Sequence, residues 1–454
     1  MILKDKKVLV FGTGKSGIAA ARLLQKVGAP VILYDENKEK EADSLKDKLV
    51  SDKNAEIYLG EFPDDMLNQI DLMILSPGIA VDHPFVMAVK RRNIPVWGEI
   101  ELAYRFSKGR IIAVTGTNGK TTTTSLIGEI MKAWYKEVFV CGNIGNPYSD
   151  IALETTNDSV TVIEVSSFQL ETVHEFRPDV SVILNITPDH LNRHYTMENY
   201  IRLKKDIAKN QDMGSLSILN YEDEHTRRIG TELNARVMYF SSERVLDDGI
   251  YLDGDDIFYK KDKNTIHICN VNELRILGKH NYENVMASVG AGIAMGIPIE
   301  VIYKAVISFK AVEHRIEYVD TIDGVSYYND SKGTNPDASI KAVLAMKAPT
   351  ILIGGGYDKG LAFDEWVKCF HGRVKLLVLM GQTREIIAET AKKYGFTNIV
   401  MVNDLKEAVR VSAKRAANGD AVLLSPACAS WDMFDSYEQR GRMFKEYVRE
   451  LRNS

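Results

Sequence analysis

The sequence predicts an α/β protein with three domains, each built around a mostly parallel sheet. Short apolar runs alternate with helix-compatible segments along most of the 454-residue chain, a pattern typical of β–α–β units. Several runs end in glycine-rich turns, and parallel sheets bind their ligands at that edge. The length exceeds what one hydrophobic core accommodates and corresponds to roughly three domains. We place these domains at residues 1–108, 109–311 and 312–454.

Composition and charge exclude several classes of protein. The chain is 45% hydrophobic and 26% charged, which is typical of a soluble globular protein. A net charge of -5 without a basic stripe argues against nucleic acid as the main partner. Four scattered cysteines favour reduced thiols in a cytosol over disulfides or a zinc site. With no signal-like N-terminus, membrane-length apolar window or coiled-coil heptads, we expect a cytoplasmic monomer that does not insert into membranes.

The first domain opens with a strand, a glycine turn and a helix. Residues 7–11 are apolar and β-rich, Gly12-Thr13-Gly14-Lys15-Ser16-Gly17 follows, and residues 18–27 are helix-compatible. A second strand, residues 31–34, ends at Asp35. This pattern is a dinucleotide-binding fingerprint. It indicates a pyrophosphate on a helix N-terminus and a carboxylate near a hydroxyl or N–H, so an NAD-dependent oxidoreductase and other nucleotide-binding proteins both fit.

The same domain contains a second tight turn. A strand at residues 72–75 ends in Ser76-Pro77-Gly78, at the carboxyl edge that the first glycine turn also occupies. Strand–helix alternation continues to about residue 107, and residues 107–110 read as a linker.

The second domain begins with a candidate phosphate loop. An apolar strand, residues 111–115, leads into Gly116-Thr117-Asn118-Gly119-Lys120-Thr121-Thr122, and a helix is predicted over residues 123–134. Inward N–H groups, the helix dipole and Lys120 would cradle an anion, and Thr121 stands where such loops ligate Mg²⁺. The standard spacing requires glycine where this chain has Val114. A threonine-capped glycine turn with an exposed lysine is the simpler alternative.

Two further residues could meet this loop at the sheet edge. Glu164 interrupts a run that otherwise reads as a buried strand, so it must be paired or bind a metal. A strand at residues 180–186 runs into His190, which is equally compatible with a surface histidine. If Thr121, Glu164 and His190 lie together, they supply oxygen and nitrogen ligands beside a triphosphate.

The rest of the chain supplies more strands and turns. A helix is predicted at residues 200–211, a hairpin at residues 249–258 and a helix at residues 285–295. In the third domain, strands are predicted at residues 321–328 (a pair), 350–353, 376–380, 399–402 and 421–424. Glycine- and serine-rich turns follow several of these strands.

Taken together, the motifs resemble those of the Mur ligase family, in that family's order and over nearly the whole chain. They are G-T-N-G-K-T-T, E-V-S-S-F-Q-L, N-I-T-P-D-H-L, H-N-x-x-N, H-R, N-D-S-K-G-T-N-P and S-P-A-C-A-S-W-D. The last two, with Tyr437-Glu438-Gln439-Arg440-Gly441, resemble the members that add D-glutamate. The D-N-P-R-type loop of the diaminopimelate- or lysine-adding members is absent from the sequence.

The resemblance implies an ATP-dependent ligase of peptidoglycan precursor synthesis. Such an enzyme joins the carboxylate of UDP-N-acetylmuramoyl-L-alanine to the amine of D-glutamate through an acyl phosphate. It also implies a Rossmann-like UDP-substrate-binding domain, a P-loop-type central ATPase domain and a Rossmann-like amino-acid-binding domain that closes when substrates bind. Alternatives are a related or folylpolyglutamate-type ligase for another amino acid, and a nucleotide-binding regulatory module without catalysis.

The resemblance further implies three groups of binding residues. For ATP they are Gly116, Thr117, Asn118, Gly119, Lys120, Thr121, Thr122, Asn281, Asn284, Arg315 and Asp330, with His280 nearby. For the UDP substrate they are Gly14, Ser16, Gly17, Asp35, Ser76, Pro77, Gly78 and Asn143. For D-glutamate they are Lys332, Thr334, Lys359, Ser430 and Tyr437. One familiar member has an arginine just after Asp35, where this chain has Glu36-Asn37-Lys38.

Two Mg²⁺ ions are implied by the same resemblance. Thr121 and Glu164 would hold one beside the phosphates, and His190 would hold the second together with a carbamylated lysine. Alignment of Tyr-Ile-Arg-Leu-Lys places that lysine at Lys204. Lys120, His190 and Lys204 are therefore the expected catalytic residues, and an unmodified Lys204 is the alternative.

Overall fold

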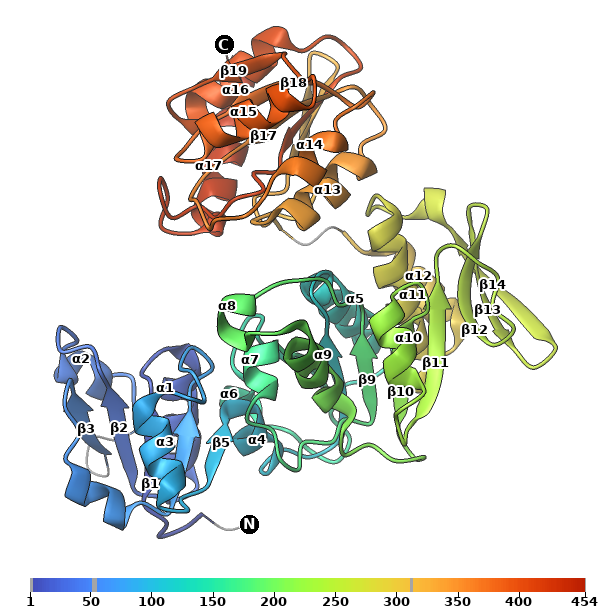
Figure 1. Ribbon diagram of the computed structural model, residues 1–454. Coiled ribbons are helices and arrows are strands. Elements are labelled where there is room, and N and C mark those ends of the chain that lie inside the picture. Colours follow the sequence, from blue (N-terminus) through green and yellow to red (C-terminus); the bar gives the residue numbers. More distant parts are fainter. Residues whose placement is uncertain (1–2, 51–54, 311–312, 454) are drawn as a thin grey trace. The chain divides into compact units, whose positions relative to one another are not determined.

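A computed structural model describes residues 3–50, 55–310 and 313–453 (Figure 1). The chain divides into two compact units, Met1–Val271 with Glu283–Val306 and Asn272–Tyr282 with Ile307–Ser454. The first unit contains two sheets and the second contains one, and all three are mostly parallel. The predicted α/β class with three sheet-based domains is confirmed, whereas the predicted boundaries remain predictions. Among the described residues, no helix is both long and apolar enough to cross a membrane.

The first sheet has five parallel strands in the order β3-β2-β1-β4-β5. The strands are β1 Val8–Phe11, β2 Val31–Asp35, β3 Ala55–Leu59, β4 Leu72–Leu75 and β5 Val96–Gly98. The helices are α1 Lys15–Lys26, α2 Ala42–Lys46, the 3-10 helix η1 Asp64–Gln69, α3 Pro84–Arg91 and α4 Glu99–Tyr104. Val8 and Val10 pack with α1, and Leu9 and Phe11 pack with α3. Both faces are covered, which explains why the strands are continuous apolar runs.

The second sheet has nine strands in the order β14-β13-β12-β11-β10-β9-β6-β8-β7. They are β6 Arg110–Thr115, β7 Val138–Gly142, β8 Val160–Glu164, β9 Val180–Ile183, β10 Leu216–Asn220, β11 Arg236–Ser241, β12 Gly249–Asp253, β13 Asp256–Lys261 and β14 Asn264–Asn270. Only the pairs β12–β13 and β13–β14 are antiparallel among the described strands of this sheet (Figure 1). The predicted hairpin at residues 249–258 is confirmed, with Gly254 at φ +58° in its turn.

Helices surround this sheet, and several element boundaries differ from the sequence predictions. The helices are α5 Lys120–Lys132, α6 Tyr148–Ile151, α7 Ser167–Leu170, α8 Leu191–His194, α9 Met197–Lys205, η2 Asp206–Ala208, α10 Glu224–Gly230, η3 Val271–Glu273, α11 Lys279–Ala294 and α12 Ile299–Ser308. Helix α5 begins at Lys120, before the predicted start at residue 123. Strand β9 ends at Ile183, before residue 186, because the chain turns there to contact the phosphate loop. The helix predicted over 200–211 is α9 followed by η2, and Thr196 caps its start.

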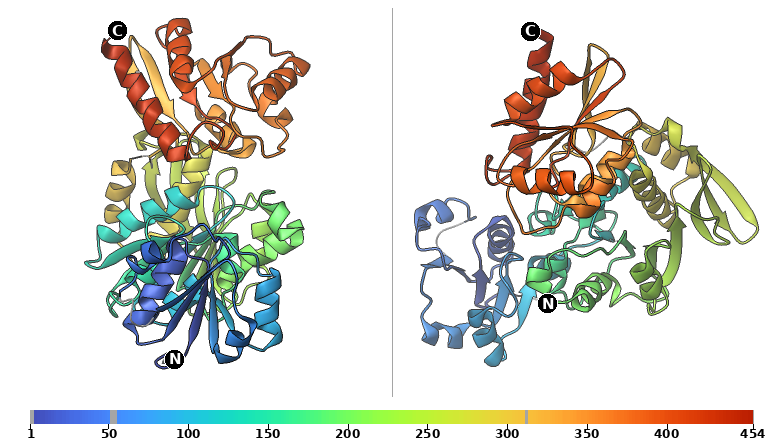
Figure 2. Two further views of the ribbon diagram at one scale, coloured as in Figure 1. Left: turned by 90° about the vertical axis from the view of Figure 1, so that its left-hand side faces the viewer. Right: turned by 45° about the horizontal axis from the view of Figure 1, so that its top comes forward.

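The third sheet, in the second unit, has six strands in the order β15-β16-β20-β17-β18-β19. They are β15 Glu317–Ile322, β16 Val325–Asn329, β17 Thr350–Gly354, β18 Val374–Leu379, β19 Ile399–Met401 and β20 Ala421–Leu424. The helices are α13 Pro336–Ala345, α14 Asp364–Lys368, α15 Arg384–Lys393, α16 Leu405–Arg415, α17 Tyr437–Glu450 and η4 Leu451–Asn453. Helices α13 to α15 pack on one face and α16 and α17 on the other (Figure 2). All the strands predicted for this domain are therefore present, within a few residues at their ends.

Polar and apolar contacts join the two sheets of the first unit. One hydrophobic cluster includes residues from both sheets. The buried carboxylate of Glu101 on α4 accepts hydrogen bonds from the backbone N–H groups of residues 174–176 at 2.8–3.1 Å. Arg22 of α1 pairs with Asp150 of α6 at 2.6 Å. These contacts join helices of the first sheet to the second sheet's domain within the first unit.

Candidate active site

A cavity of about 520 Å³ lies at the carboxyl ends of β1, β2 and β4. Parallel sheets bind ligands at this edge. Residues predicted for the UDP-containing substrate line it: Gly14, Ser16, Asp35, Ser76, Pro77 and Gly78. Of the other two predicted residues, Gly17 packs beneath the cavity, and Asn143 lies on the second sheet, where it contacts Glu164.

Gly17 brings the first turn of α1 against the end of β1. A Cβ atom at this position would lie 1.8 Å from the carbonyl oxygen of Gly12 and 2.9 Å from Ser76 Oγ. Ser76 Oγ donates a hydrogen bond to the same carbonyl at 3.0 Å. Glycine therefore permits the close helix–strand contact that forms the floor of the cavity.

Asp35 ends β2 and is held by neighbours at the rim of the cavity. Its Oδ2 accepts hydrogen bonds from the backbone N and Oγ1 of Thr13 at 2.9 and 2.7 Å, and from Lys40 Nζ at 2.6 Å. Burial opposes ionisation, but the hydrogen bonds from Lys40 and Thr13 outweigh it and lower the pKa of Asp35 to about 2. Sequence reasoning missed Lys40, because no motif links it to Asp35 and only the loop after β2 brings it back.

The predicted phosphate loop joins the end of β6 to the start of α5. Gly116 and Gly119 have φ values of +151° and +88°, which favour glycine. A Cβ atom on Gly119 would lie 2.3 Å from Asn284 Oδ1, so this position also has no room for a side chain. The first N–H groups of α5 have no acceptor within the helix, and together with the helix dipole they favour an anion.

The segment after β9 supports this loop. Thr117 N donates to Asn185 O at 2.9 Å, and Asn118 N donates to Asn185 Oδ1 at 2.9 Å. Thr117 Oγ1 also lies 3.1 Å from Tyr200 Oη. Asn185 and Tyr200 were not among the predicted site residues. Their presence in the motifs N-I-T-P-D-H-L and Tyr-Ile-Arg-Leu-Lys was the available signal.

Two lysines converge on one carbonyl oxygen of the phosphate loop. Lys120 Nζ donates to Gly116 O at 2.9 Å, and Lys204 Nζ donates to the same oxygen at 2.7 Å. Lys204 comes from α9 and is only 1% exposed. Burial, and then the charge of Lys120, hold the pKa of Lys204 well below its usual value, although Asp189 opposes the shift. Burial and the charge of Lys120 therefore both make the ammonium form of Lys204 less stable than it is in water.

Glu164 ends β8, beside β6 and in register with Val114. It is 2% exposed, and its Oε1 accepts a hydrogen bond from Asn143 Nδ2 at 2.9 Å. Within the part of the chain that the structure describes, its Oε2 has no hydrogen-bond partner. A buried carboxylate oxygen without a partner is costly, and a bound cation would satisfy it. Glu164 therefore fits the predicted role as a metal ligand.

Two histidines follow β9 in different environments. His190 has φ +54°, is 48% exposed at its side chain and packs its ring against Phe168. Its Nε2 lies 3.5 Å from Asp189 Oδ2. His194 is buried with its Nε2 2.9 Å from Ser167 Oγ, and burial lowers its pKa to about 4. His190, the predicted ligand, is the one that presents its ring to solvent.

The segment carrying these histidines also contacts the wall of the first cavity. Arg193 donates from Nη2 to the carbonyl oxygen of Ile79, a cavity-lining residue, at 2.7 Å. The same guanidinium pairs with Glu171 at 2.6 Å. Tyr195 Oη donates to Asp82 at 2.6 Å. The segment after β9 therefore contacts both the wall of this cavity and, through Asn185, the phosphate loop.

The motif H-N-x-x-N opens helix α11. Asn284 lies against the phosphate loop, where its Oδ1 accepts a hydrogen bond from Thr123 Oγ1 at 3.2 Å. Asn281 belongs to the second unit, where its Nδ2 donates to Leu277 O at 2.7 Å. The structure therefore places Asn284, but not Asn281, in the unit that carries the loop.

In the second unit, Asp330 follows β16 and is buried. Its Oδ2 accepts a hydrogen bond from Ser425 Oγ at 2.7 Å, and its Oδ1 accepts one from Ile316 N at 3.3 Å. Burial raises the pKa of Asp330 to about 7, against the opposing effects of Ser425 and Arg315. Arg315 Nε is buried without a hydrogen-bond partner among the described residues.

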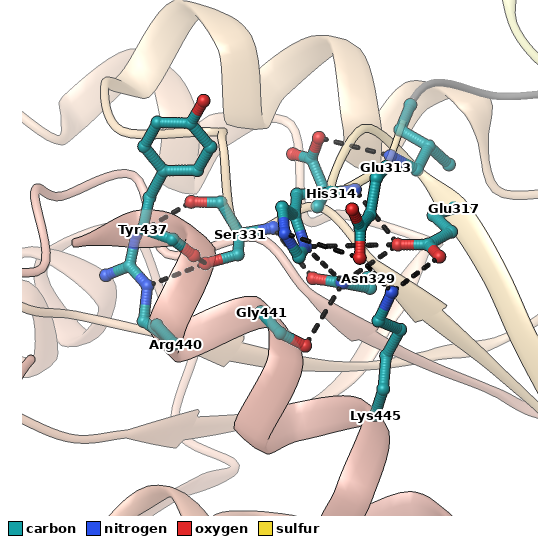
Figure 3. A network of polar contacts seen from close by, with 11 residues as sticks. Glu313, His314, Glu317, Asn329, Ser331, Tyr437, Arg440, Gly441 and Lys445 are labelled. Carbon is teal, nitrogen blue, oxygen red and sulfur yellow. Dashed lines mark hydrogen bonds and ion pairs between the residues drawn. The ribbon is translucent and has the colours of Figure 1, made fainter.

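The residues predicted to bind D-glutamate lie after strands at the carboxyl edge of the third sheet. Lys332 and Thr334 follow β16, Lys359 follows β17, Ser430 follows β20, and Tyr437 begins α17. Lys332 Nζ lies 5.4 Å from the ring centre of Tyr437, and Lys359 Nζ lies 5.1 Å from that of Trp431. Figure 3 shows Tyr437 beside a buried polar network that includes Arg440. Two cations and several hydroxyls on neighbouring loops suit a ligand with carboxylate groups.

Three family models match the chain in order. They are the "Mur ligase MurD-like, N-terminal domain" at residues 6–98, the "Mur ligase middle domain" at residues 114–292 and the "Mur ligase, glutamate ligase domain" at residues 314–428. Solved structures with the same fold include UDP-N-acetylmuramate-alanine ligase MurC from Thermotoga maritima (TM-score 0.62, 19% identity, 99% of this chain and 100% of that chain). A pseudomurein peptide ligase type C from Methanothermus fervidus also matches (TM-score 0.59, 18% identity, 98% and 100%).

Curated relatives match over the full length at higher identity. UDP-N-acetylmuramoylalanine--D-glutamate ligase of Lachnoclostridium phytofermentans is 56% identical over 448 residues (99% of each chain). The enzyme of the same name from Lachnospira eligens is 56% identical over 451 residues (99% of this chain and 100% of the relative), and that from Thermoanaerobacter sp. is 49% identical over 456 residues (100% of both). With the phosphate loop, the buried carboxylate and the matching fold, these similarities establish that the chain belongs to the Mur ligase family.

Proposed function

We propose that this chain joins D-glutamate to UDP-N-acetylmuramoyl-L-alanine and converts ATP to ADP and phosphate. The L-alanyl carboxylate attacks the γ-phosphorus, and ADP leaves. The amine of D-glutamate then attacks the acyl phosphate, and the tetrahedral intermediate expels phosphate to leave an amide. The names of full-length relatives at 49–56% identity support the choice of substrates. The proposed reaction, ATP-dependent formation of an amide bond, is the reaction of the ligases to which the family belongs.

The convergence of Lys120 and Lys204 on Gly116 O carries the catalytic part of the proposal. In the first step an anionic carboxylate must approach an anionic triphosphate, so like-charge repulsion is the main electrostatic barrier. Lys120 at the helix N-terminus stabilises negative charge that develops on the transferred phosphoryl group. The backbone N–H groups of the loop hold the phosphates in place, which supplies orientation without reorganisation at the moment of reaction.

The side chains around the loop fit Mg²⁺. The unpartnered Glu164 Oε2 and the hydroxyl of Thr121, one residue into α5, are hard oxygen ligands. When bound, Mg²⁺ supplies positive charge that offsets the charge of the phosphates. We assign Thr121 and Glu164 to one ion and His190 with a modified Lys204 to a second.

Lys204 is suited to carbamylation in its surroundings. Its neutral amine, favoured by burial and by Lys120, attacks CO₂ to form an N–C bond and releases one proton. The product is an anionic carbamate with two oxygen ligands in place of a cation. The carbamate carries a negative charge beside the positive charge of Lys120, and it supplies a ligand that an ammonium cannot provide.

The remaining predicted residues are assigned to the recognition of the substrates. The diphosphate of the UDP substrate is assigned to the helix N-terminus of α1 with Ser16, Gly17 and the Ser76-Pro77-Gly78 turn, and the uracil to Asp35. Asn143 is assigned to the acyl-phosphate end. The carboxylates of D-glutamate are assigned to Lys332, Thr334, Lys359, Ser430 and Tyr437. Arg315, Asp330 and Asn281 are assigned to the ATP side of the second unit, which we propose closes during catalysis.

ATP and UDP-linked sugars are cytoplasmic metabolites, so the proposal places the enzyme in the cytoplasm. It acts as a monomer in this proposal, and nucleic acid has no role in it.

The proposal is tested by ADP release with ATP, Mg²⁺ and UDP-N-acetylmuramoyl-L-alanine. The amines offered in turn are D-glutamate, L-glutamate, meso-diaminopimelate, L-lysine and L-alanine, with a control without amine. We expect turnover with D-glutamate alone. Turnover with another amine instead would keep the ligase chemistry and refute the assigned acceptor. Folded protein that binds ATP but turns over none of the amines would favour a nucleotide-binding module.

A further inference from the structure

Arg440, in the first turn of α17, is a fully buried arginine whose partners are all uncharged. It is 0% exposed, and its side-chain hydrogen-bond acceptors among the described residues are one hydroxyl and three carbonyl oxygens. Its Nε donates to Ser331 Oγ at 2.9 Å and its Nη2 to Ser331 O at 2.8 Å (Figure 3). Its Nη2 and Nη1 also donate to the carbonyl oxygens of Cys428 and Ala429, at 3.2 and 3.3 Å.

These acceptors belong to the segments that carry the assigned D-glutamate residues. Ser331 directly precedes Lys332, and Ala429 directly precedes Ser430. Ser331 Oγ also donates to the carbonyl oxygen of Tyr437 at 2.8 Å, so the same hydroxyl links a third segment. One planar guanidinium therefore fixes the spacing of three neighbouring segments, which a single-point donor could not do.

A fourth segment packs against the same guanidinium. A Cβ atom added to Gly356 would lie 3.3 Å from Arg440 Nη1, so the loop after β17 approaches it closely. Tyr357 N donates to Ala429 O at 2.9 Å, which ties this loop to the one after β20. Lys359 lies on the loop that is held in this way.

The charge of Arg440 is not neutralised by its own contacts. Burial lowers its pKa to about 10, so the guanidinium remains protonated at neutral pH. Its hydrogen-bond acceptors are carbonyls and a hydroxyl, which leave its net charge in the site. Asp330 and Asp432 offset part of this charge through space, without forming an ion pair with the guanidinium. A buried cation whose charge is only partly offset attracts an anionic ligand.

We propose that Arg440 is a positioning residue for the dicarboxylate acceptor: it sets the spacing of the Lys332, Ser430 and Tyr437 segments and adds positive potential beneath them. This inference rests on the proposed function, because D-glutamate is the acceptor assigned there. Arg440 acts through the residues that it holds and not by contact with the reacting atoms.

Other contacts dock the same helix without Arg440. Asn329 Nδ2 donates to Gly441 O at 3.3 Å and lies 2.9 Å from His314 Nδ1. Lys445 of α17 bridges Glu313 and Glu317. Helix α17 should therefore stay in place when Arg440 is replaced, and Lys445 provides a matched control on the same helix.

The test compares Arg440→Met, Arg440→Lys and the control Lys445→Met with the wild type. The KM values for D-glutamate, ATP and UDP-N-acetylmuramoyl-L-alanine are measured, with the melting temperature. Hydroxylamine trapping of the acyl phosphate, as the hydroxamate, reports the first chemical step without D-glutamate. We expect Arg440→Met to raise the KM for D-glutamate by at least about tenfold, because misplaced binding groups lose orientation. Hydroxamate formation at saturating ATP and the KM for UDP-N-acetylmuramoyl-L-alanine should stay within about twofold, since the residues assigned to that substrate belong to the first unit. The KM for ATP should rise less than that for D-glutamate, although Asp330, assigned to ATP, directly precedes Ser331.

The KM of Arg440→Lys for D-glutamate should lie between the values for Arg440→Met and the wild type. Lysine keeps the positive charge but lacks the several fixed N–H donors of the guanidinium. Lys445→Met should lower the melting temperature without changing the KM for D-glutamate. An unchanged KM for D-glutamate in Arg440→Met would overturn the inference, as would an equal loss of hydroxamate formation and D-glutamate turnover. If Arg440→Met does not fold, Arg440→Lys decides between these outcomes. Failure of the wild type to use D-glutamate refutes the proposed function instead, and the comparison is then made with the amine that it uses.

Discussion

The molecule contains two strand–glycine loop–helix segments that differ in the charges around them. In the first sheet, β1 leads through Gly12 to α1, whose first residue is Lys15. In the second sheet, β6 leads through Gly116 to α5, whose first residue is Lys120. Lys15 is exposed at the rim of a cavity, whereas Lys120 folds onto Gly116 O. The local pattern is the same, but only the second loop has a buried lysine and a buried carboxylate close by.

The difference shows that such a fingerprint identifies an anion site and not its ligand. The second loop receives Lys204 from α9 and Glu164 from β8, both distant in sequence. The first receives a carboxylate, Asp35, that Thr13 and Lys40 already hold. A loop beside a buried carboxylate oxygen without a partner suits phosphoryl transfer with a bound cation, and a loop whose carboxylate is already paired with a lysine suits binding alone. Membership of the Mur ligase family likewise sets aside the NAD-dependent oxidoreductase that the first fingerprint allowed.

The largest predicted effect is a difference between Lys120, the first residue of α5, and Lys15, the first residue of α1. Lys120→Ala should lower kcat by at least about 100-fold, the scale of removing one group that stabilises developing charge. Lys15→Ala should leave the KM for ATP and kcat nearly unchanged, because Lys15 belongs to the other loop. Steady-state ADP release measures both variants. Equal losses in the two variants would show that the loops are not specialised in this way.

The second prediction concerns the lysine that only the second loop has. Lys204→Ala should lower kcat by more than about tenfold, because the carbamate ligand is lost. Activity of the wild type should fall in CO₂-depleted buffer and return with bicarbonate. The control is Lys205→Ala, since Lys205 pairs with Glu232 on the surface at 2.6 Å. If bicarbonate does not change the activity of the wild type and Lys204→Ala is as active as the wild type, carbamylation is ruled out.

The third prediction compares two glycines of the first loop. Gly17→Ala places a Cβ atom 1.8 Å from Gly12 O, so the helix must shift. Overpacking of this kind typically costs about 1–3 kcal/mol of stability, and the KM for the UDP substrate should rise. Gly14→Ala is the control, because its Cβ atom would meet no atom within 4 Å. Equal melting temperatures for Gly17→Ala and Gly14→Ala would contradict the close packing of Gly17.

The smallest effect concerns pH and the first loop. The pKa of Asp35 in the folded protein, about 2, lies below the ordinary value near 3.9. Ionised Asp35 therefore stabilises the fold above about pH 4, and this contribution is lost as the pH falls towards 2. Asp35→Asn should melt at a lower temperature than the wild type near neutral pH, and the difference should shrink in acid. A difference that does not depend on pH would show that the charge of Asp35 contributes nothing.

Sequence patterns predicted most strands because buried parallel strands are continuous apolar runs between turns. They were less accurate where a distant contact sets the boundary. Strand β9 ends at Ile183 because Asn185 turns towards the phosphate loop, whereas the apolar Leu184 and Ile186 on either side of it extended the predicted strand to residue 186. Helix α5 begins at Lys120, where the threonines of the loop gave no helical signal.

Candidate site residues were predictable where a motif contains them, and their partners were not. Glu164 was predictable because it is a charged residue in an apolar run. Only the structure shows that its side chain accepts a hydrogen bond from Asn143. Lys40 lies on a loop outside every motif, and its contact with Asp35 could not be read from the sequence. Arg440 stands in the motif at residues 437–441, but only the structure shows that it holds Ser331. The shared carbonyl of Lys120 and Lys204 likewise depends on the packing of α9 against the loop.

The central claim is that the second loop activates a carboxylate by phosphoryl transfer. Its most direct test uses UDP-N-acetylmuramoyl-L-alanine labelled with ¹⁸O in the alanyl carboxylate, together with unlabelled ATP and D-glutamate. Mass spectrometry of the released phosphate follows the oxygen. Transfer through an acyl phosphate predicts one labelled oxygen in each phosphate. Unlabelled phosphate formed alongside the amide product would contradict it.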